Sequence, residues 1–112
     1  MKSRIAILAG LALAVAGCTT APSAATNPLQ ARWNGKTAGS FFAAYGPPLS
    51  DVEGTGGTTL YKWRGGFAKG RACQVELTVD GSYRIRTIRA VVDQPGQKGG
   101  PSHCERTLDA AG

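Results

Sequence analysis

Three cysteines and one histidine are the side chains of this 112-residue chain with the clearest chemistry. Cys73 and Cys104 form an even pair, and two thiols allow a single intramolecular disulfide. Closing that loop of about 32 residues would stabilise the fold by roughly 3.5–4 kcal/mol in the chain-entropy account. A zinc or redox site is the competing interpretation, but there is no C-x-x-C motif and His103 is the only histidine, so the ligands are too few. His103 has no second histidine or free cysteine to form a nucleophilic pair, and we expect it to be a loop histidine.

The first 17 residues have the layout of a secretion signal. The basic residues Lys2 and Arg4 precede an unbroken apolar run from Ile5 to Ala16, and small residues close the segment. A helix of about twelve residues would be ~18 Å long, which is short of the ~30 Å hydrocarbon layer. The sequence therefore predicts export with residues 1–17 as a signal peptide, and not a stable membrane span.

The signal ends in the motif Val15-Ala16-Gly17-Cys18. This motif resembles the bacterial lipobox, which implies that Cys18 carries acyl chains such as palmitate and becomes the first mature residue. Thr19 stands where Asp typically retains a lipoprotein at the inner membrane, so the resemblance implies an outer-membrane anchor facing the periplasm. An ordinary signal peptide with a coincidental cysteine is the alternative. Either route delivers Cys73 and Cys104 to an oxidising compartment.

The 95 residues that remain after removal of the signal suffice for one small domain and a tether. Residues 18–32 are small and polar, are broken by two prolines and lack an apolar period, so we expect a lipidated flexible tether. Residues 33–108 are predicted to form a single domain. Residues 109–112 are predicted to be a frayed C-terminus.

One short helix is expected within residues 33–48. Thr37 can accept a hydrogen bond from a free amide of the first turn. Phe41 and Tyr45 are four residues apart and share one apolar stripe. Gly46 and the two prolines after it end the helix.

Three strands are expected after the helix, over residues 59–64, 73–79 and 82–92, with residues 49–58 as a loop. The dipeptide Asp80-Gly81 is typical of a two-residue hairpin turn, and that turn would place Cys73 opposite about Ile88. A change of phase in the last strand predicts a β-bulge near Thr87. The expected fold is therefore α+β, with one short helix packed on a three-stranded antiparallel meander and a disulfide staple.

Most aromatic side chains are assigned to the core, with an exposed recognition patch as the alternative. They are Phe41, Tyr45, Tyr61, Trp63 and Tyr83.

Basic residues are in excess, with 13 Lys and Arg against 7 Asp and Glu, and the mature net charge is +4 once Lys2 and Arg4 leave. The cations that alternate onto one face of the first and last predicted strands are Lys62, Arg64, Arg84 and Arg86. Together they predict a positive sheet face whose partners would be acidic headgroups, an acidic polysaccharide or an acidic protein surface. Nucleic acid is not expected outside the cytoplasm. A solvated face without a partner is the alternative.

The domain as a whole resembles a known family of small proteobacterial lipoproteins. The markers are the segments Trp33-Asn34-Gly35-Lys36-Thr37, Tyr45-Gly46-Pro47-Pro48 and Tyr61-Lys62-Trp63. Over roughly residues 33–92 they resemble the SmpA/OmlA (BamE-like) type, in which a G-x-T/S helix start is followed by a G-x-P helix stop and an aromatic strand. This chain departs by having one clear helix instead of two and by its cysteine pair. The resemblance implies support of outer-membrane protein assembly.

The residues predict binding instead of catalysis. No acid–base pair, nucleophilic pair or phosphate-binding glycine loop stands out, so neither an enzyme nor a cofactor is expected. Anchored to the bilayer through Cys18, the domain is expected to be a structural or assembly accessory. An envelope inhibitor or an anionic-ligand-binding module, acting on an envelope protein or an anionic polymer, is the second hypothesis.

Overall fold

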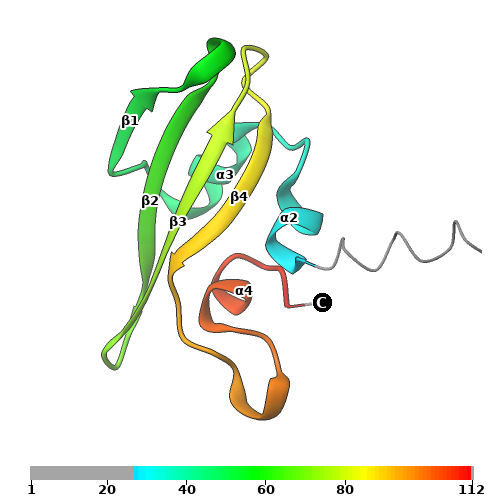
Figure 1. Ribbon diagram of the computed structural model, residues 1–112. Coiled ribbons are helices and arrows are strands. Elements are labelled where there is room, and N and C mark those ends of the chain that lie inside the picture. The colour runs from blue at the N-terminus through cyan, green and yellow to red at the C-terminus, as the bar shows by residue number, and fades with distance from the viewer. Residues whose placement is uncertain (1–26, 112) are drawn as a thin grey trace, which may run out of the picture.

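The computed structural model describes residues 27–111, in which an antiparallel sheet of four strands carries three short helices on one face (Figure 1). The helices are α2 (Pro28–Trp33), α3 (Ala38–Tyr45) and α4 (His103–Thr107), and the strands are β1 (Ser50–Glu53), β2 (Thr59–Ala68), β3 (Arg71–Val79) and β4 (Ile85–Val92). Two 3₁₀ turns, η2 (Thr55–Gly57) and η3 (Gln97–Gly99), lie in the connections. The spatial order β1-β2-β3-β4 is that of a meander. Cys18 lies outside the described residues.

Strand β3 is central and follows its sequence pattern. Its alternate residues are fully buried in the core at Cys73, Val75, Leu77 and Val79. The residues between them are half-buried on the opposite face at Gln74, Glu76 and Thr78. This period of two is what a sheet with one covered face requires, and it confirms the strand predicted over residues 73–79.

The sheet has four strands and not the three predicted. Strand β1 lies in the segment expected to be a loop, and it pairs antiparallel with β2 from Ser50↔Lys62 to Glu53↔Thr59. All four β1 residues are exposed. A strand with no buried face leaves no apolar alternation in the sequence, so only its backbone pairing defines it.

The tight two-residue turn occurs between β2 and β3, and not between β3 and β4 as predicted. Strands β2 and β3 extend up to the pair Ala68↔Arg71, and the central residues Lys69 (φ 49°) and Gly70 (φ 79°) both have the positive φ of a type I′ turn. The Asp80-Gly81 connection is longer than two residues, since Val79 pairs with Ile85. Its turn bond runs from Tyr83 N–H to Asp80 O, and Tyr83 has a φ of 65°.

The longer turn changes the pairing of β3 with β4. Leu77, and not Cys73, lies opposite Ile88. A register shift falls between the pairs Thr78↔Thr87 and Val79↔Ile85, which leaves Arg86 as the extra residue. The bulge predicted near Thr87 is thereby confirmed.

Helix α3 forms where the caps predicted it. Thr37 Oγ1 accepts from Ser40 N–H at 3.2 Å, and Gly46 N–H closes the helix on Phe42 O at 2.8 Å. The ring of Phe41 is fully buried and meets the rings of Trp33 and Trp63 edge-on, with centroids 5.1 and 5.7 Å apart.

The core prediction for the aromatic residues is confirmed for Phe41 and Trp63, and Tyr45 and Tyr61 pack half-buried against the core. It is wrong for Tyr83, which is 46% exposed in the 80–84 turn.

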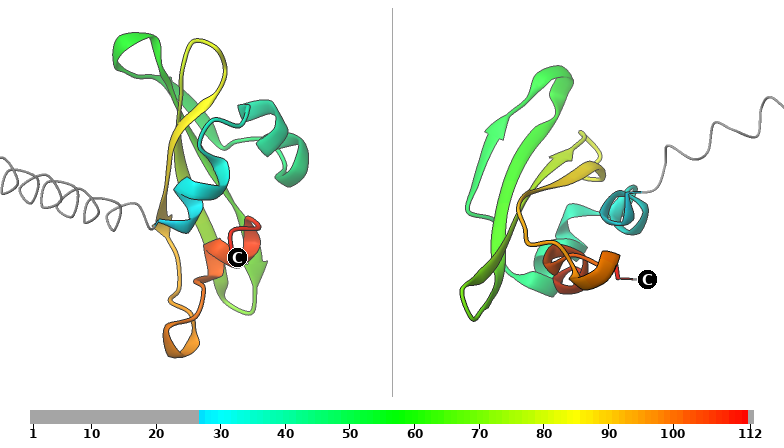
Figure 2. Two further views of the ribbon diagram at one scale, coloured as in Figure 1. Left: turned by 90° about the vertical axis from the view of Figure 1, so that its right-hand side faces the viewer. Right: turned by 60° about the horizontal axis from the view of Figure 1, so that its bottom comes forward.

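Two further helices correct the expected boundaries. Helix α2 begins within the predicted tether and ends at the first residue of the predicted domain; Asn27 is its N-cap, and it buries Leu29 and Trp33. It was missed because six residues are too few to show a helical period. Helix α4 contradicts the single-helix prediction, and the buried Ala110 contradicts a frayed end at that position. Figure 2 shows α2, α3 and α4 on the same side of the sheet.

The outer edge of β4 is covered by the chain itself. The side-chain amide of Gln30 donates to Arg86 O at 2.7 Å and accepts from Ile88 N–H at 3.0 Å. Residues 35–36 pair with Ile85 in the same way, through Gly35 N–H to Ile85 O and Ile85 N–H to Lys36 O, both at 2.8 Å. These bonds satisfy backbone groups that an edge strand otherwise presents to other chains.

Candidate functional site

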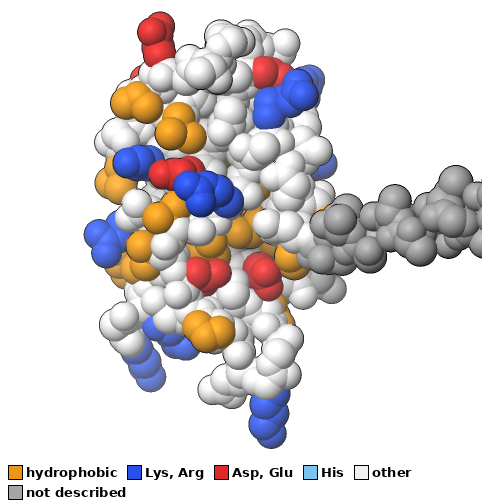
Figure 3. All heavy atoms as spheres, viewed as in Figure 1, with side chains coloured by type: hydrophobic (Ala, Val, Ile, Leu, Met, Phe, Trp, Pro, Cys, Tyr) orange, Lys and Arg blue, Asp and Glu red, His pale blue; other side chains and the backbone are white. Residues whose placement is uncertain are grey.

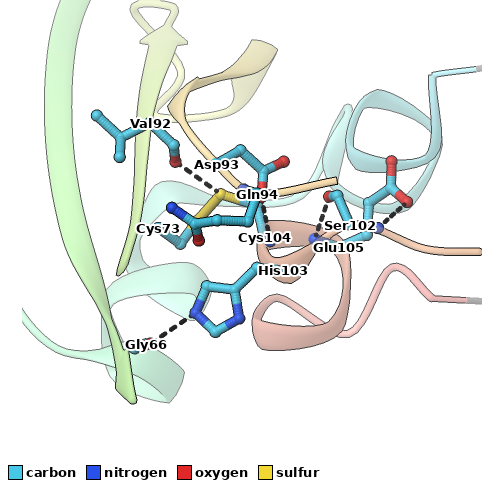
Figure 4. Close-up of a disulfide and its surroundings, with 9 residues drawn as sticks. All are labelled: Gly66, Cys73, Val92, Asp93, Gln94, Ser102, His103, Cys104 and Glu105. Carbon is cyan, nitrogen blue, oxygen red and sulfur yellow. Dashed lines mark hydrogen bonds between the residues drawn. A yellow bond between two sulfur atoms is a disulfide. The ribbon is translucent and has the colours of Figure 1, made fainter. Parts of the chain in front are cut away.

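The predicted disulfide is present. Cys73 on β3 and Cys104 on α4 are joined, with Cα atoms 5.0 Å apart, and both residues are fully buried. The bond ties α4 to the covered face of the sheet, as the close-up in Figure 4 shows.

Helix α4 starts at a capping box beside this disulfide. Ser102 Oγ accepts from Glu105 N–H at 3.1 Å, and Glu105 Oε1 accepts from Ser102 N–H at 3.0 Å (Figure 4). Asp93 Oδ1 accepts from Cys104 N–H at 2.8 Å. Five residues form a stable helix here because the cap, the carboxylate and the disulfide hold its first turn.

His103 is a packing residue and not the loop histidine that was expected. It is the first residue of α4, it is 8% exposed, and its Nε2 lies 2.6 Å from Gly66 O of β2. A carbonyl oxygen only accepts, so Nε2 carries the proton and donates. Gly66 has a φ of 65°, and a Cβ there would lie 2.8 Å from the Oγ1 of Thr107. The contact ties α4 to β2.

Within residues 27–111 no group of three or more His, Cys, Asp or Glu side chains is placed to hold a metal ion.

Two of the four predicted cations lie on strand β2, on the uncovered face of the sheet. Lys62 and Arg64 lie on it, at the pairs Lys62↔Glu76 and Arg64↔Gln74. Arg89, which the sequence interpretation did not select, also lies there and pairs with Glu76 at 2.9 Å. Figure 3 shows this face as a mixture of charged, polar and apolar side chains.

Arg84 and Arg86 lie at the turn end of β4 and have internal partners. Arg84 donates to Gly35 O at 2.9 Å, and Arg86 pairs with Asp80 at 3.4 Å. The backbone N–H groups of Arg84 and Ser82, and then the Arg86 guanidinium, hold the pKa of Asp80 below its usual range. The predicted group of four cations is therefore divided into two pairs, because the longer turn and the bulge place the two arginines at the turn end, where partners within the chain hold them.

A second cationic group was missed by the sequence interpretation. At the far end of β2 and β3, Phe67 is 69% exposed, and the guanidinium of Arg64 lies 5.5 Å from the centroid of its ring. Lys69 and Arg71 are exposed beside it. One signal was present in the sequence, since no acidic residue occurs between Glu53 and Glu76.

The remaining polar cluster joins the two ends of the described chain. Asp109 accepts from Arg32 Nε through its backbone oxygen at 3.1 Å and from the hydroxyl of Tyr45 through its carboxylate. Burial, and then the Asp109 carboxylate, raise the pKa of Tyr45 well above its usual value. A shallow recess of about 310 Å³ lies beside this cluster, lined by Pro28, Ala31, Arg32, Asp109 and Ala110. A neutral tyrosine held by a carboxylate ties α3 to the C-terminal segment.

No model of a known protein family matches the chain, and no curated protein or solved structure matches it either. None of the helices in the described part of the chain has the length and apolar content to cross a bilayer.

Proposed function

We propose that this protein is a bacterial cell-envelope lipoprotein that acts by binding, as a structural or assembly accessory at the outer membrane. The lipobox-like motif ending at Cys18 supports the anchor, and acyl chains on that residue would hold the domain at the bilayer. The resemblance to BamE-like lipoproteins supports the assembly role.

The observation that carries the binding role is the uncovered face of the sheet. All three described helices pack on the opposite face, so a surface about 14 Å wide across four strands stays open. It displays Lys62, Arg64 and Arg89 among other side chains of mixed polarity. Small-molecule sites are concave and mostly apolar, whereas an open surface of mixed polarity suits another macromolecule. The partner of this face is therefore a protein or a polymer.

The alternative, an inhibitor or anionic-ligand module, is favoured by one specific observation. Among the described residues neither Lys62 nor Arg64 is in an ion pair, and Glu76, opposite Lys62, is engaged by Arg89. Two adjacent unpaired cations suit an acidic polymer such as an anionic polysaccharide.

The test is co-purification from envelopes solubilised in mild detergent, using the full acylated protein. The double variant Lys62→Glu/Arg64→Glu should lose the membrane protein that wild type captures. The control Lys36→Glu/Arg106→Glu carries the same charge change on two exposed cations outside the uncovered sheet face, and it should capture normally. Equal capture by both variants would refute a role for the sheet face. Capture of an anionic polysaccharide, with no membrane protein, would favour the alternative.

A further inference from the structure

Residues 65–72 form a two-stranded arm, which we call the β2–β3 tip. The pairing of β1 with β2 reaches no further than Lys62, and that of β4 with β3 ends at Val92↔Gln74. Beyond these points β2 and β3 pair only with each other, down to Ala68↔Arg71. Figure 1 shows the resulting hairpin projecting past the rest of the sheet.

The β2–β3 tip has a fixed orientation. A two-stranded ribbon alone is only marginally stable, so its base must be held by the domain. His103 bonds Gly66 O on one strand, and the disulfide holds Cys73 at the foot of the other. A Cβ on Gly65 would lie 2.5 Å from the ring of Trp63, so the indole lies directly against this glycine. The contacts anchor the ribbon to the core.

The β2–β3 tip presents one exposed apolar side chain with basic side chains around it. Phe67 is the most exposed large hydrophobic side chain of the described residues, at 69%. Arg64, Lys69 and Arg71 are exposed near it, and neither salt bridge of the described residues involves them. No acidic residue lies within the tip.

We propose that the β2–β3 tip docks on an anionic lipid surface, with Phe67 entering the boundary between headgroups and acyl chains. Arg64, Lys69 and Arg71 then contact lipid phosphates. Charge complementarity selects this occupant, because basic residues next to an aromatic anchor are attracted to anionic lipid while the ring leaves water. A narrow hairpin end also enters a fluid interface without a preformed pocket, which a protein partner would have to supply. The proposal rests on the proposed anchor only in that Cys18 brings the tip to a bilayer.

The experiment reads the depth of a single new indole. Phe67→Trp is made in the full acylated protein, whose own Trp33 and Trp63 are 4% and 3% exposed and so shielded from the bilayer. Tyr83→Trp, at the opposite end of the sheet and also exposed, is the matched control. Both proteins are incorporated into vesicles of equal parts phosphatidylcholine and phosphatidylglycerol with brominated acyl chains, and into brominated phosphatidylcholine alone.

In the anionic vesicles Phe67→Trp should be quenched several-fold more strongly than Tyr83→Trp. Adding Lys69→Glu and Arg71→Glu should reduce its quenching to the control level, and phosphatidylcholine alone should do the same. Equal quenching of the two indoles, or quenching that ignores lipid charge, would overturn the proposal. An indole unquenched by lipid that shifts on addition of solubilised envelope protein would also overturn it, in favour of a protein partner.

Flotation of the vesicles separates this proposal from the proposed anchor. Protein that floats without quenching of the Phe67→Trp indole contradicts the docking of the tip and leaves the anchor standing. Protein that fails to float contradicts the anchor. Flotation and quenching are both measured on the same mixture of protein and vesicles.

Discussion

The two ends of the sheet are stabilised in different ways. At the turn end, which holds residues 54–58 and 80–84, polar groups find partners within the chain. Asp80 Oδ1 accepts from Ser82 N–H at 2.9 Å and from Arg84 N–H at 3.1 Å, and Thr58 Oγ1 donates to Thr55 O at 2.6 Å. At the tip end, Phe67, Lys69 and Arg71 project into solvent. The base of this hairpin is held in place by the contact of His103 and by the disulfide.

The difference shows where the molecule depends on local chemistry and where on distant contacts. The 80–84 turn is stabilised by residues within a few positions of one another. The β2–β3 tip is supported by α4, which lies some 30 residues later in the chain and is held by the Cys73–Cys104 bond with a sequence separation of 31. The exposed β2–β3 tip is therefore supported by a helix that a disulfide links to β3.

Removal of the disulfide should have the largest effect. Cys73→Ser/Cys104→Ser should lower the free energy of unfolding by roughly 3.5–4 kcal/mol, because the unfolded chain regains the entropy of an open loop. Urea denaturation measures it, with reduced wild type as the control, since reductant should destabilise wild type and not the variant. An unchanged midpoint would show that the tip end does not need its covalent support.

Two glycine substitutions compare the ends directly. Gly66→Ala should cost about 1–3 kcal/mol, because alanine at φ 65° is strained and its Cβ would press on Thr107. Gly81→Ala at the turn end meets open space and should change stability by less than about 0.5 kcal/mol. The comparison of the two ends fails if the two variants unfold at the same urea concentration.

The stability that the turn end contributes should depend on pH. The pKa of Asp80 is lowered in the fold, so its carboxylate stabilises the protein above the ordinary pKa of 3.8 and this contribution is lost as the pH falls through the lowered value. Asp80→Asn keeps the acceptor oxygen but loses the charge. Its stability should lie slightly below that of wild type near neutral pH and match it in strong acid. A difference that stays constant across that pH range would argue against the charge.

The sequence predicted the elements whose pattern lies within a few neighbouring residues. Strand β3 alternates strictly, α3 has a capping residue and a stop, and the parity of Cys73 and Cys104 indicated their bond. Strand β1 escaped because all of it is exposed, and α2 because it is only six residues long.

The candidate surfaces were predicted less well because they depend on register. A turn longer by a few residues, with a bulge at Arg86, gives two of the four predicted cations partners within the chain at the turn end of the sheet. The segment GGFAKG was assigned to a connection from its glycines, so Phe67 was not considered as a surface anchor. Which side chains a hairpin presents follows from its pairing. The β2–β3 pairing resumes at Ala68↔Arg71 after a register shift at glycines, which weaken a strand prediction.

The most direct test of the central claim is the mass of the N-terminal peptide of the native protein, measured in separated membrane and soluble fractions. We expect a peptide in the membrane fraction that begins at Cys18 and carries acyl chains, with Cys73 and Cys104 disulfide-linked. A soluble chain that still begins at Met1, with all three thiols reduced, would contradict it.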